Sequence, residues 1–387
     1  MNSDTIALNL QPIAGENLTG IGQYALAISK ELVAIDGQES FEGHIFDFLG
    51  RNKASDLVSK LLKINDMHIV TSMPLGAYIR AGNMAKICSY ERLTRSNANV
   101  TVFFNYLVPQ ALKGKSIITI YDMVCERYPE TMDDRNRRLL QNHLRQSANK
   151  ADAIVTISDF SKKEIVEILG VPSSKVFVAK CGVDSNFYCP NDSENSRQEE
   201  KTKLQESYGI DKFFLYVGTL EPRKNLGVLI DAFEGVAKDY PDVKLVIAGG
   251  VGWHSEEMLS KIENSSFKNR IIRTGYVSDE MKRDLYRNSE ALVLPSLYEG
   301  FGMPVVEAMA CAAQCIVSSS SSLPEVSGGF AQEVDSQDVE GFSKAMARIL
   351  VKDDKVLVSK EDLISNSKKF DWHTAAMVYK EAILFAK

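Results

Sequence analysis

The feature that most constrains the fold of this chain is a regular alternation of short β-branched runs with amphipathic helical stretches. Such alternation is typical of βαβ units, which form parallel sheets covered by helices. The strands fall into two series, and between them residues 191–207 are polar and charged, with almost nothing to bury, which is typical of a linker or an exposed helix. We therefore predict an α/β fold of two doubly wound, Rossmann-like domains that face each other across a cleft.

The periodicity also gives approximate boundaries. The first series predicts strands over residues 5–10, 44–48, 100–104, 116–120, 153–157 and 176–178. The second predicts strands over residues 213–217, 244–248, 270–273, 291–294 and 314–317. We assign an N-terminal domain to 1–188, a linker to 189–209, a C-terminal domain to 210–367 and a final helix to 368–387, which packs back on the N-terminal domain. Ligands of such sheets bind outside the carboxyl ends of the strands.

Composition excludes several classes of protein. The formal net charge is −6, so nucleic acid is not predicted as a partner. The six cysteines form no Cys-x-x-Cys pair, which is typical of reduced cytosolic thiols. The N-terminus shows no signal-peptide pattern, and no apolar run approaches the roughly 18 residues that span a bilayer. We expect a cytoplasmic protein that is at most peripheral to a membrane.

Two carboxylates, Glu299 and Glu307, bracket a Gly-Phe-Gly loop that follows the buried strand 291–294. The loop enters a helix near Pro304, a residue suited to the first helical position because its missing N–H costs nothing there. A strand, a glycine loop and a helix N-terminus together present free backbone N–H groups to an anion. A carboxylate beside a bound phosphate makes sense when it accepts hydrogen bonds from hydroxyls, as a sugar offers.

Arg223 and Lys224 follow the first strand of the second series, at the junction with a helix. Both can point at one diphosphate, Arg with a planar fork of donors and Lys with a compact charge. They would then stabilise the charge of a departing phosphate ester. A solvated pair at a helix start is the alternative. No Asp-x-Asp motif occurs, so no metal is predicted, and these cations would do its work.

The first half offers weaker candidates. Gly20 and Gly22 open the first long helix and formally match the dinucleotide fingerprint, but the loop lies too far after the strand for its tight turn. We therefore reject NAD; a loop that reaches a phosphate and a plain helix start both remain open. Tyr121 and Asp122 follow the strand 116–120, where Asp122 could orient an acceptor hydroxyl or cap the next turn. Asn105 follows the strand 100–104 in the same way.

Residues 78–95 mix apolar and basic side chains. Together with the arginines of the 135–145 segment, they could face an anionic membrane or a diphosphate-lipid acceptor. Solvated helix faces explain the same residues, and we favour that interpretation.

Taken together, these motifs resemble the retaining glycosyltransferases of family 4, which have the GT-B fold, and the resemblance covers nearly the whole chain. The Glu-x7-Glu signature of the family is matched by Glu299 and Glu307. Its Gly-Thr-x-x-x-Arg-Lys-Asn element is matched from Gly218 to Asn225, and its entry loop from Gly20 to Tyr24. Further matches include Gly249-Gly250, Gly275-Tyr276-Val277 and Leu323-Pro324-Glu325-Val326.

The resemblance implies a metal-independent enzyme whose second domain binds a nucleotide diphosphate sugar and whose first domain binds the acceptor. Its implied catalytic residues are Glu299, Arg223, Lys224 and Asp122. Its implied donor-binding residues are Gly20, Gly22, Gly218, Thr219, Val277, Phe301, Gly302, Met303 and Glu307, with Glu307 on the nucleotide ribose. Tyr121 and Asn105 would contact the acceptor, although relatives usually carry a histidine in place of Tyr121.

Among subgroups, the chain is most similar to bacterial mannosyltransferases that build O-antigen and other surface polysaccharides. This implies transfer of a hexose, mannose from GDP-mannose, to a glycan or lipid-diphosphate-linked glycan, with peripheral contact at the cytoplasmic face of the inner membrane. Donor choice rests on that analogy alone. Two alternatives stay open: a sugar-nucleotide epimerase of similar architecture, and a non-catalytic subunit that binds a sugar nucleotide.

Overall fold

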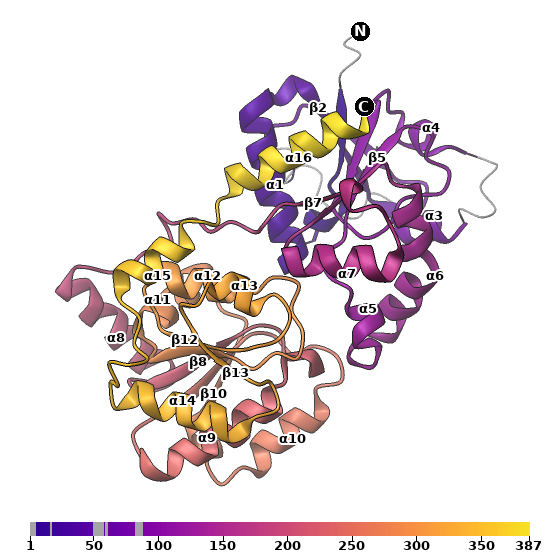
Figure 1. The fold of residues 1–387 in the computed structure, drawn as a ribbon. Helices are drawn as coiled ribbons and strands as arrows, with labels where there is room; N and C mark the ends of the chain where they lie inside the picture. Colours follow the sequence, from indigo (N-terminus) through magenta and orange to yellow (C-terminus); the bar gives the residue numbers. More distant parts are fainter. Residues whose placement is uncertain (1–4, 16–17, 49–57, 59–60, 82–87) are drawn as a thin grey trace. The chain divides into compact units, whose positions relative to one another are not determined.

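The protein is described by a computed structural model of all residues except 1–4, 16–17, 49–57, 59–60 and 82–87. The chain divides into two compact α/β units (Figure 1). The first unit comprises Met1–Met123, Arg135–Gly182 and Trp372–Lys387, and the second comprises Val124–Asp134 and Val183–Asp371. Each unit contains one parallel sheet with helices around it, which confirms the predicted fold class of two doubly wound, Rossmann-like domains.

The sheet of the first unit has seven strands in the order β3-β2-β1-β4-β5-β6-β7. The strands are β1 (Ile6–Asn9), β2 (Phe41–Phe46), β3 (Asp66–Val70), β4 (Val100–Phe103), β5 (Lys115–Thr119), β6 (Ala153–Thr156) and β7 (Val176–Val178). The order reverses direction at β1 and β4, which is the switch point where ligands of doubly wound sheets bind. The edge strand β3 was not predicted, because polar residues such as Asp66 and His68 interrupt its apolar pattern.

The helices of the first unit are α1 (Gly20–Asp36), α3 (Leu75–Ala81), α4 (Tyr90–Thr94), α6 (Asp134–Lys150), α7 (Asp159–Leu169) and α16 (Trp372–Ala386), with 3-10 turns η1 (Gln11–Ile13), η2 (Gln38–Ser40) and η5 (Ser173–Lys175). The C-terminal helix α16 packs against α1 and the strands β5, β6 and β7. The hydroxyl of Tyr379 on α16 lies 2.7 Å from that of Thr119 on β5, and both residues are buried. The last helix therefore completes the core of the first unit.

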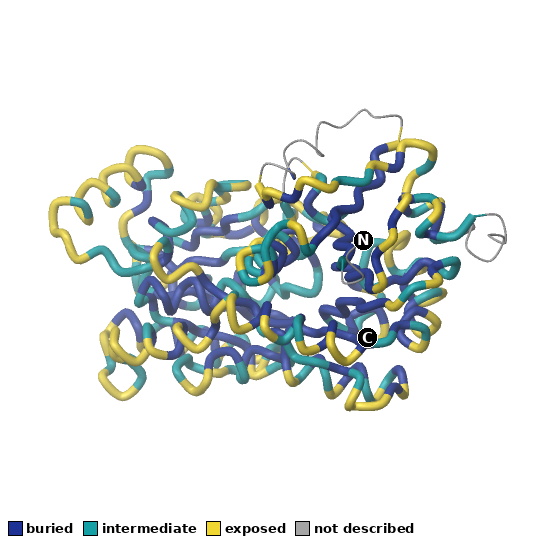
Figure 2. Tube along the Cα trace, turned by 90° about the horizontal axis from the view of Figure 1, so that it is seen from above, coloured by how far each residue is buried: buried dark blue, intermediate teal, exposed yellow. Residues whose placement is uncertain are grey.

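The sheet of the second unit has six strands in the order β10-β9-β8-β11-β12-β13. They are β8 (Phe213–Val217), β9 (Lys244–Ala248), β10 (Ile271–Gly275), β11 (Ala291–Leu294), β12 (Cys315–Ser318) and β13 (Gln332–Val334). The central strands are almost wholly buried. Buried residues are dark blue in Figure 2. Strands buried on both faces explain the continuous apolar runs in the sequence.

The helices of the second unit are α5 (Val124–Arg127), α8 (Glu194–Tyr208), α9 (Leu226–Asp239), α10 (Glu256–Asn264), α11 (Asp279–Asn288), α12 (Met303–Ala310), α13 (Leu323–Ser327), α14 (Val339–Leu350) and α15 (Lys360–Ser367), with 3-10 turns η4 (Pro129–Thr131), η6 (Pro222–Lys224) and η7 (Lys268–Arg270). Helices α9, α10 and α14 lie over one face of the sheet, and α11, α12, α13 and α15 over the other (Figure 1).

The unit boundaries differ from the expected ones. The first boundary falls after Gly182, and most of the expected linker 189–209 forms helix α8 of the second unit. The helix is held on α11 by charged pairs that apolar periodicity does not reveal. Lys203 pairs with the buried Asp284 at 2.8 Å, and Glu200 pairs with Arg287 at 2.7 Å.

The structure bears only partly on the basic segment. Of residues 78–95, positions 82–87 lie outside the described residues. Arg145 donates to the carbonyls of Leu169, at 3.0 Å, and Ile168, at 2.7 Å, at the end of α7, where a cation suits the helix dipole. Within the described ranges, no helix combines the length and apolar character that crossing a bilayer requires. Membrane contact stays a prediction.

Candidate active site

The two loops that carry the predicted site follow β8 and β11, which are adjacent parallel strands. Their carboxyl ends therefore lie side by side. The N–H of Leu297 donates to the carbonyl of Arg223 at 2.9 Å. The side-chain amide of Asn225 donates to the carbonyl of Pro295 at 3.0 Å, while its backbone turns with a φ of 56°. These bonds fix the loop after β8 on the loop after β11.

The loops bring together a compact cluster of charges. Arg223 donates through Nη1 to Oε2 of Glu299 at 2.9 Å and through Nη2 to Oε1 of Glu221 at 2.5 Å. Lys224 donates through Nζ to Oε1 of Glu299 at 2.7 Å. The side chains of Arg223 and Lys224 are 15% exposed and that of Glu299 is 8% exposed. The two predicted cations and the first carboxylate of the signature are thus in direct contact.

The electrostatics of Glu299 follow from these contacts. Burial by itself would raise the pKa of its carboxyl, but the nearby Lys224 and Arg223 outweigh burial and lower this pKa to about 2. Glu299 is therefore an anion that holds both cations in place. Glu221, two residues before Arg223, was not predicted, although its carboxylate is buried and completes the cluster.

Serine side chains fix the loop around Glu299. Ser296 donates to Oε1 of Glu299 at 2.8 Å, and Ser321 accepts from its N–H at 2.8 Å. The hydroxyl of Ser322 lies 2.9 Å from the carbonyl of Glu299 and 2.8 Å from that of Phe301. The serine tract 318–322, which carried no predicted role, thus holds the glycine loop in position.

The second carboxylate of the signature, Glu307, is the fifth residue of α12 and is buried against α11. Its Oε1 accepts from Nζ of Lys282 at 3.0 Å, and its Oε2 accepts from the hydroxyl of Tyr286 at 2.8 Å. Burial lowers the pKa of Lys282, but Glu307 and Tyr188 outweigh it, so the pKa rises above its usual value. Lys282 and Tyr286 were missed by sequence reasoning; their spacing of four on one helix was the available signal.

Glycines allow the loops of the second unit to approach each other. Gly249 has a φ of 152°, and a Cβ at this position would lie 2.0 Å from the carbonyl oxygen of Gly218. Gly218 itself has a φ of 153°. Gly302, with a φ of 108°, precedes the first residue of α12, and a Cβ there would lie 2.7 Å from the side chain of Leu323.

The other predicted donor residues of the second unit lie around this edge. Phe301 is buried, and its ring packs edge-on against Phe370. Thr219 is exposed, and Met303 and Val277 are half-buried. Thr219 and Val277 follow β8 and β10, whose carboxyl ends share the same edge of the sheet. Their contacts with a donor stay predictions.

In the first unit, the structure gives Tyr121 a packing role. Its side chain is 5% exposed, its hydroxyl donates to the carbonyl of Phe104 at 3.1 Å, and its ring lies edge-on to those of Tyr24 and Tyr106. Burial raises the pKa of Tyr121 well above its usual value. An acceptor contact through this hydroxyl was expected, but the hydroxyl already has a backbone partner.

Polar groups gather at the carboxyl edge of β4 and β5. The hydroxyl of Tyr106 donates to Oδ1 of Asp122 at 3.2 Å, and both residues are half-buried. The side chain of Asn105 accepts from the N–H of Leu107 at 3.2 Å, which shapes the loop after β4. Asp122 thus follows the end of β5 and has a hydrogen-bond partner, Tyr106, that follows the end of β4. Its contact with an acceptor stays a prediction.

The two glycines of the entry loop, Gly20 and Gly22, have different surroundings. Helix α1 begins at Gly20, and Thr19 caps it by accepting from the N–H of Gly22 at 3.3 Å. A Cβ at Gly22 would lie 2.8 Å from the carbonyl oxygen of Pro12, so close packing explains this glycine. Gly20 is exposed, with open space around the position of a Cβ. A phosphate contact at Gly20 stays a prediction.

The fold and these loops define a two-domain α/β protein of the GT-B class. Residues 197–370 match the family described as Glycosyl transferases group 1, and residues 45–187 match the family described as Glycosyltransferase Family 4. The chain belongs to these glycosyltransferases.

Curated relatives agree with this assignment. O-antigen chain mannosyltransferase B of Escherichia coli is 29% identical over 272 residues, which cover 69% of this chain and 69% of the relative. The serotype-specific mannosyltransferase WbdA of Escherichia coli is 26% identical over 96% of this chain. The chain spans about half the length of that relative, at 47%.

Solved structures share the fold. The structure of HepE from Anabaena in complex with UDP and glucose is 18% identical, with a TM-score of 0.73, and the match covers 98% of this chain and 99% of that one. The structure of WaaG, a glycosyltransferase involved in lipopolysaccharide biosynthesis, is 12% identical, with a TM-score of 0.71 and coverage of 98% and 99%. At these identities the likeness concerns the fold alone.

Proposed function

We propose that the chain transfers mannose from GDP-mannose, with retention of configuration, to a hydroxyl of a glycan or lipid-linked glycan in surface polysaccharide synthesis. The observation that carries a transfer reaction is the buried contact of Glu299 with both Arg223 and Lys224. The choice of mannose is supported by the relatives named as mannosyltransferases. A lipid-linked acceptor would bring the chain to the cytoplasmic face of the inner membrane.

The cations would act on the leaving group. In the reaction, the bond between the sugar C1 and a diphosphate oxygen breaks, and a bond from C1 to the acceptor oxygen forms. A phosphate oxygen takes the proton of the acceptor hydroxyl. Arg223 and Lys224 would bind the diphosphate and stabilise the negative charge that develops on it. Because Glu299 already holds both side chains, they would be in position before the bond breaks.

The second carboxylate would select the nucleotide. Glu307 can accept hydrogen bonds from the two hydroxyls of a ribose. The contacts with Lys282 and Tyr286 restrict the rotation of its carboxylate. Since each oxygen has further lone pairs, the carboxylate can accept from a ribose while it keeps these partners.

The acceptor would bind at the carboxyl edge of the first sheet. Asp122 would orient the acceptor hydroxyl, and the hydrogen bond from Tyr106 would orient Asp122. This assignment makes Tyr106, rather than the buried Tyr121, the tyrosine that serves the acceptor.

Thermal-shift measurements with GDP-mannose, UDP-glucose and a dTDP-sugar test the donor, because a ligand that binds the folded state raises the apparent melting temperature. We expect the largest shift with GDP-mannose. NMR of the reaction with a mannoside acceptor should then show a new α-mannosidic linkage. A larger shift with a UDP- or dTDP-sugar would overturn the donor assignment. Conversion of the donor without acceptor would indicate an epimerase, and binding without any turnover would indicate a non-catalytic subunit.

A further inference from the structure

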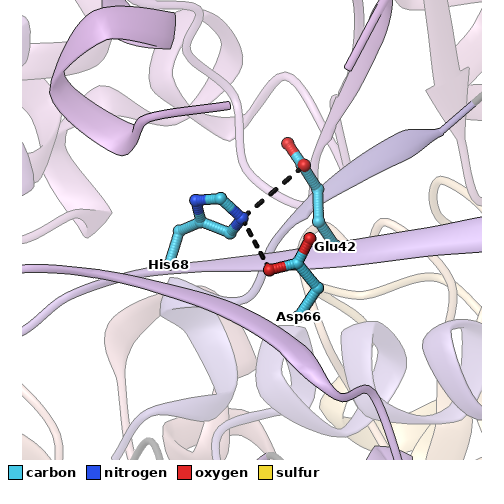
Figure 3. Close-up of side chains that lie close together, drawn as sticks. All are labelled: Glu42, Asp66 and His68. Carbon is cyan, nitrogen blue, oxygen red and sulfur yellow. Dashed lines mark ion pairs between the residues drawn. The ribbon is translucent and has the colours of Figure 1, made fainter. Parts of the chain in front are cut away.

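Four titratable side chains outside the proposed active site gather on β2 and β3. The parallel register places Glu42 beside Asp66 and His44 beside His68. Alternate residues of a strand point to the same face of a sheet, so all four lie on one face. Figure 3 shows the carboxylates of Glu42 and Asp66 both facing the same ring nitrogen of His68.

Three ligand-type atoms converge at this point. Nε2 of His68 lies 3.0 Å from Oδ1 of Asp66 and 3.6 Å from Oε2 of Glu42. One donor atom from each of the three residues lies within 4.8 Å of the others. Atoms bound to one tetrahedral ion at about 2.1 Å lie about 3.4 Å from each other, so these separations suit a shared ion.

The hydrogen bond of His68 to the backbone determines which ring nitrogen is free to bind a cation. Its Nδ1 lies 2.6 Å from the carbonyl oxygen of Thr94, which can only accept, so Nδ1 carries a proton. In the neutral ring, Nε2 then has a lone pair, and this buried atom has no hydrogen-bond partner. A lone pair that faces two carboxylate oxygens is repelled by them, and a cation bound by all three atoms removes this repulsion.

The hydrogen bonds of Glu42 occupy one of its carboxylate oxygens and leave the other, Oε2, facing His68. Tyr90 accepts from Asn9 at 3.1 Å, so its O–H can donate to Nδ1 of His44, also at 3.1 Å. The proton of His44 is then on Nε2, which donates to Oε1 of Glu42 at 3.0 Å. Ser96 also donates to Oε1. Oε1 is thus occupied by two donors, and Oε2 faces His68.

We propose that His68, Glu42 and Asp66 form a binding site for a divalent transition-metal ion. One imidazole nitrogen and two carboxylate oxygens are ligands that Zn²⁺ accepts. The hydrogen bond from His68 to the backbone of Thr94 is the outer-shell contact that metal-binding histidines usually make. The side chain of Asp66 is 68% exposed, which gives the ion a path of entry and leaves a position for water.

The position of this site assigns it a structural role. Glu42 and Asp66 lie at the beginning of their strands, whereas Asn105 and Asp122 follow the ends of parallel strands in the same sheet. The ion is therefore remote in the sheet from the proposed acceptor residues. It joins the edge strand β3 to β2 and orients the ring that binds the end of α4.

Metal content of the full chain, with any affinity tag removed, tests the proposal. The protein is stripped with EDTA and titrated with Zn²⁺, and bound metal is measured by mass spectrometry alongside the melting temperature. We expect one Zn²⁺ per chain and a higher melting temperature on binding. Co²⁺ substitution should give the visible absorption of a protein-bound ion. Mn²⁺ and Ni²⁺ are titrated in parallel.

Two variants remove ligands. His68→Gln removes the nitrogen ligand, and Asp66→Asn neutralises a carboxylate whose side chain is 68% exposed. Each should weaken binding at least about tenfold. His254→Gln, at an exposed histidine of the second unit, is the matched control and should bind as the wild type does. The proposal is overturned if the wild type binds none of these ions. It is also overturned if the Asp66→Asn variant binds them as tightly as the wild type does.

Discussion

Nζ of Lys224 and Oε1 of Glu299 lie 2.7 Å apart although 75 positions separate the two residues in the chain. The contact joins the loop after β8 to the loop after β11. It converts two separate sequence motifs into one charged cluster. The predictions below follow from this cluster, from the helix pair α11 and α12, and from the glycines behind the loops.

Replacing Lys224 by Ala should reduce turnover by about 10²- to 10³-fold, because a preorganised charge on the leaving diphosphate is lost. The measurement is kcat for transfer from the donor that gives the largest thermal shift. Lys238→Ala, at an exposed lysine of α9, is the control and should retain wild-type turnover. Near-normal kcat in Lys224→Ala would contradict the assigned role.

Glu299→Gln should change how stability depends on pH. The pKa of Glu299 is lowered from 4.5 to about 2 in the folded chain, so its stabilisation is complete above about pH 4.5 and is lost as pH falls toward 2. The shift corresponds to about 3 kcal/mol at neutral pH. Calorimetry should show the variant melting below the wild type at pH 7, with a gap that narrows below pH 4.5. Glu263→Gln, at an exposed position, should show no such gap; a gap in Glu299→Gln that is independent of pH would refute the electrostatic account.

Lys282→Met and Tyr286→Phe should raise the KM for the donor more than they lower kcat, because each releases one oxygen of Glu307. Both should also reduce the preference for a ribose over a 2′-deoxyribose nucleotide, measured as the ratio of two dissociation constants. If Lys282 and Tyr286 had a purely structural role, their replacement would weaken the binding of both nucleotides equally. Lys268→Met, at an exposed lysine of the same unit, should leave the ratio unchanged.

Gly249→Ala should destabilise the second unit by more than about 3 kcal/mol, because the new Cβ would lie 2.0 Å from the backbone of Gly218 and the φ of 152° strains any side chain. Gly250→Ala is the matched neighbour. Its Cβ would meet nothing within 4 Å, so its effect should stay within about 0.5 kcal/mol. The two variants are compared by hydrogen exchange of the β8 and β9 amides. Equal protection in both would be inconsistent with the close approach of Gly249 to the backbone of Gly218.

Much of the fold follows from local patterns. Apolar runs such as Phe213–Val217 predict buried strands, and the helices between them force parallel connections. The edge strands β3 and β13 were missed because edge strands need less apolar surface and tolerate polar residues. The segment of α8 was predicted to be a linker or an exposed helix, because charged pairs rather than an apolar face hold it on α11.

Local sequence patterns show which residues follow the central strands of the second sheet, and therefore that Arg223, Lys224 and Glu299 share its carboxyl edge. The partners of each side chain are set by tertiary packing alone. Packing brings Lys282 into contact with Glu307, and it buries Tyr121, whose hydroxyl donates to the carbonyl of Phe104. It also set His68 against Glu42 across two strands. Periodicity fixes the face and edge on which a residue lies, whereas contacts between elements depend on packing that local sequence does not encode.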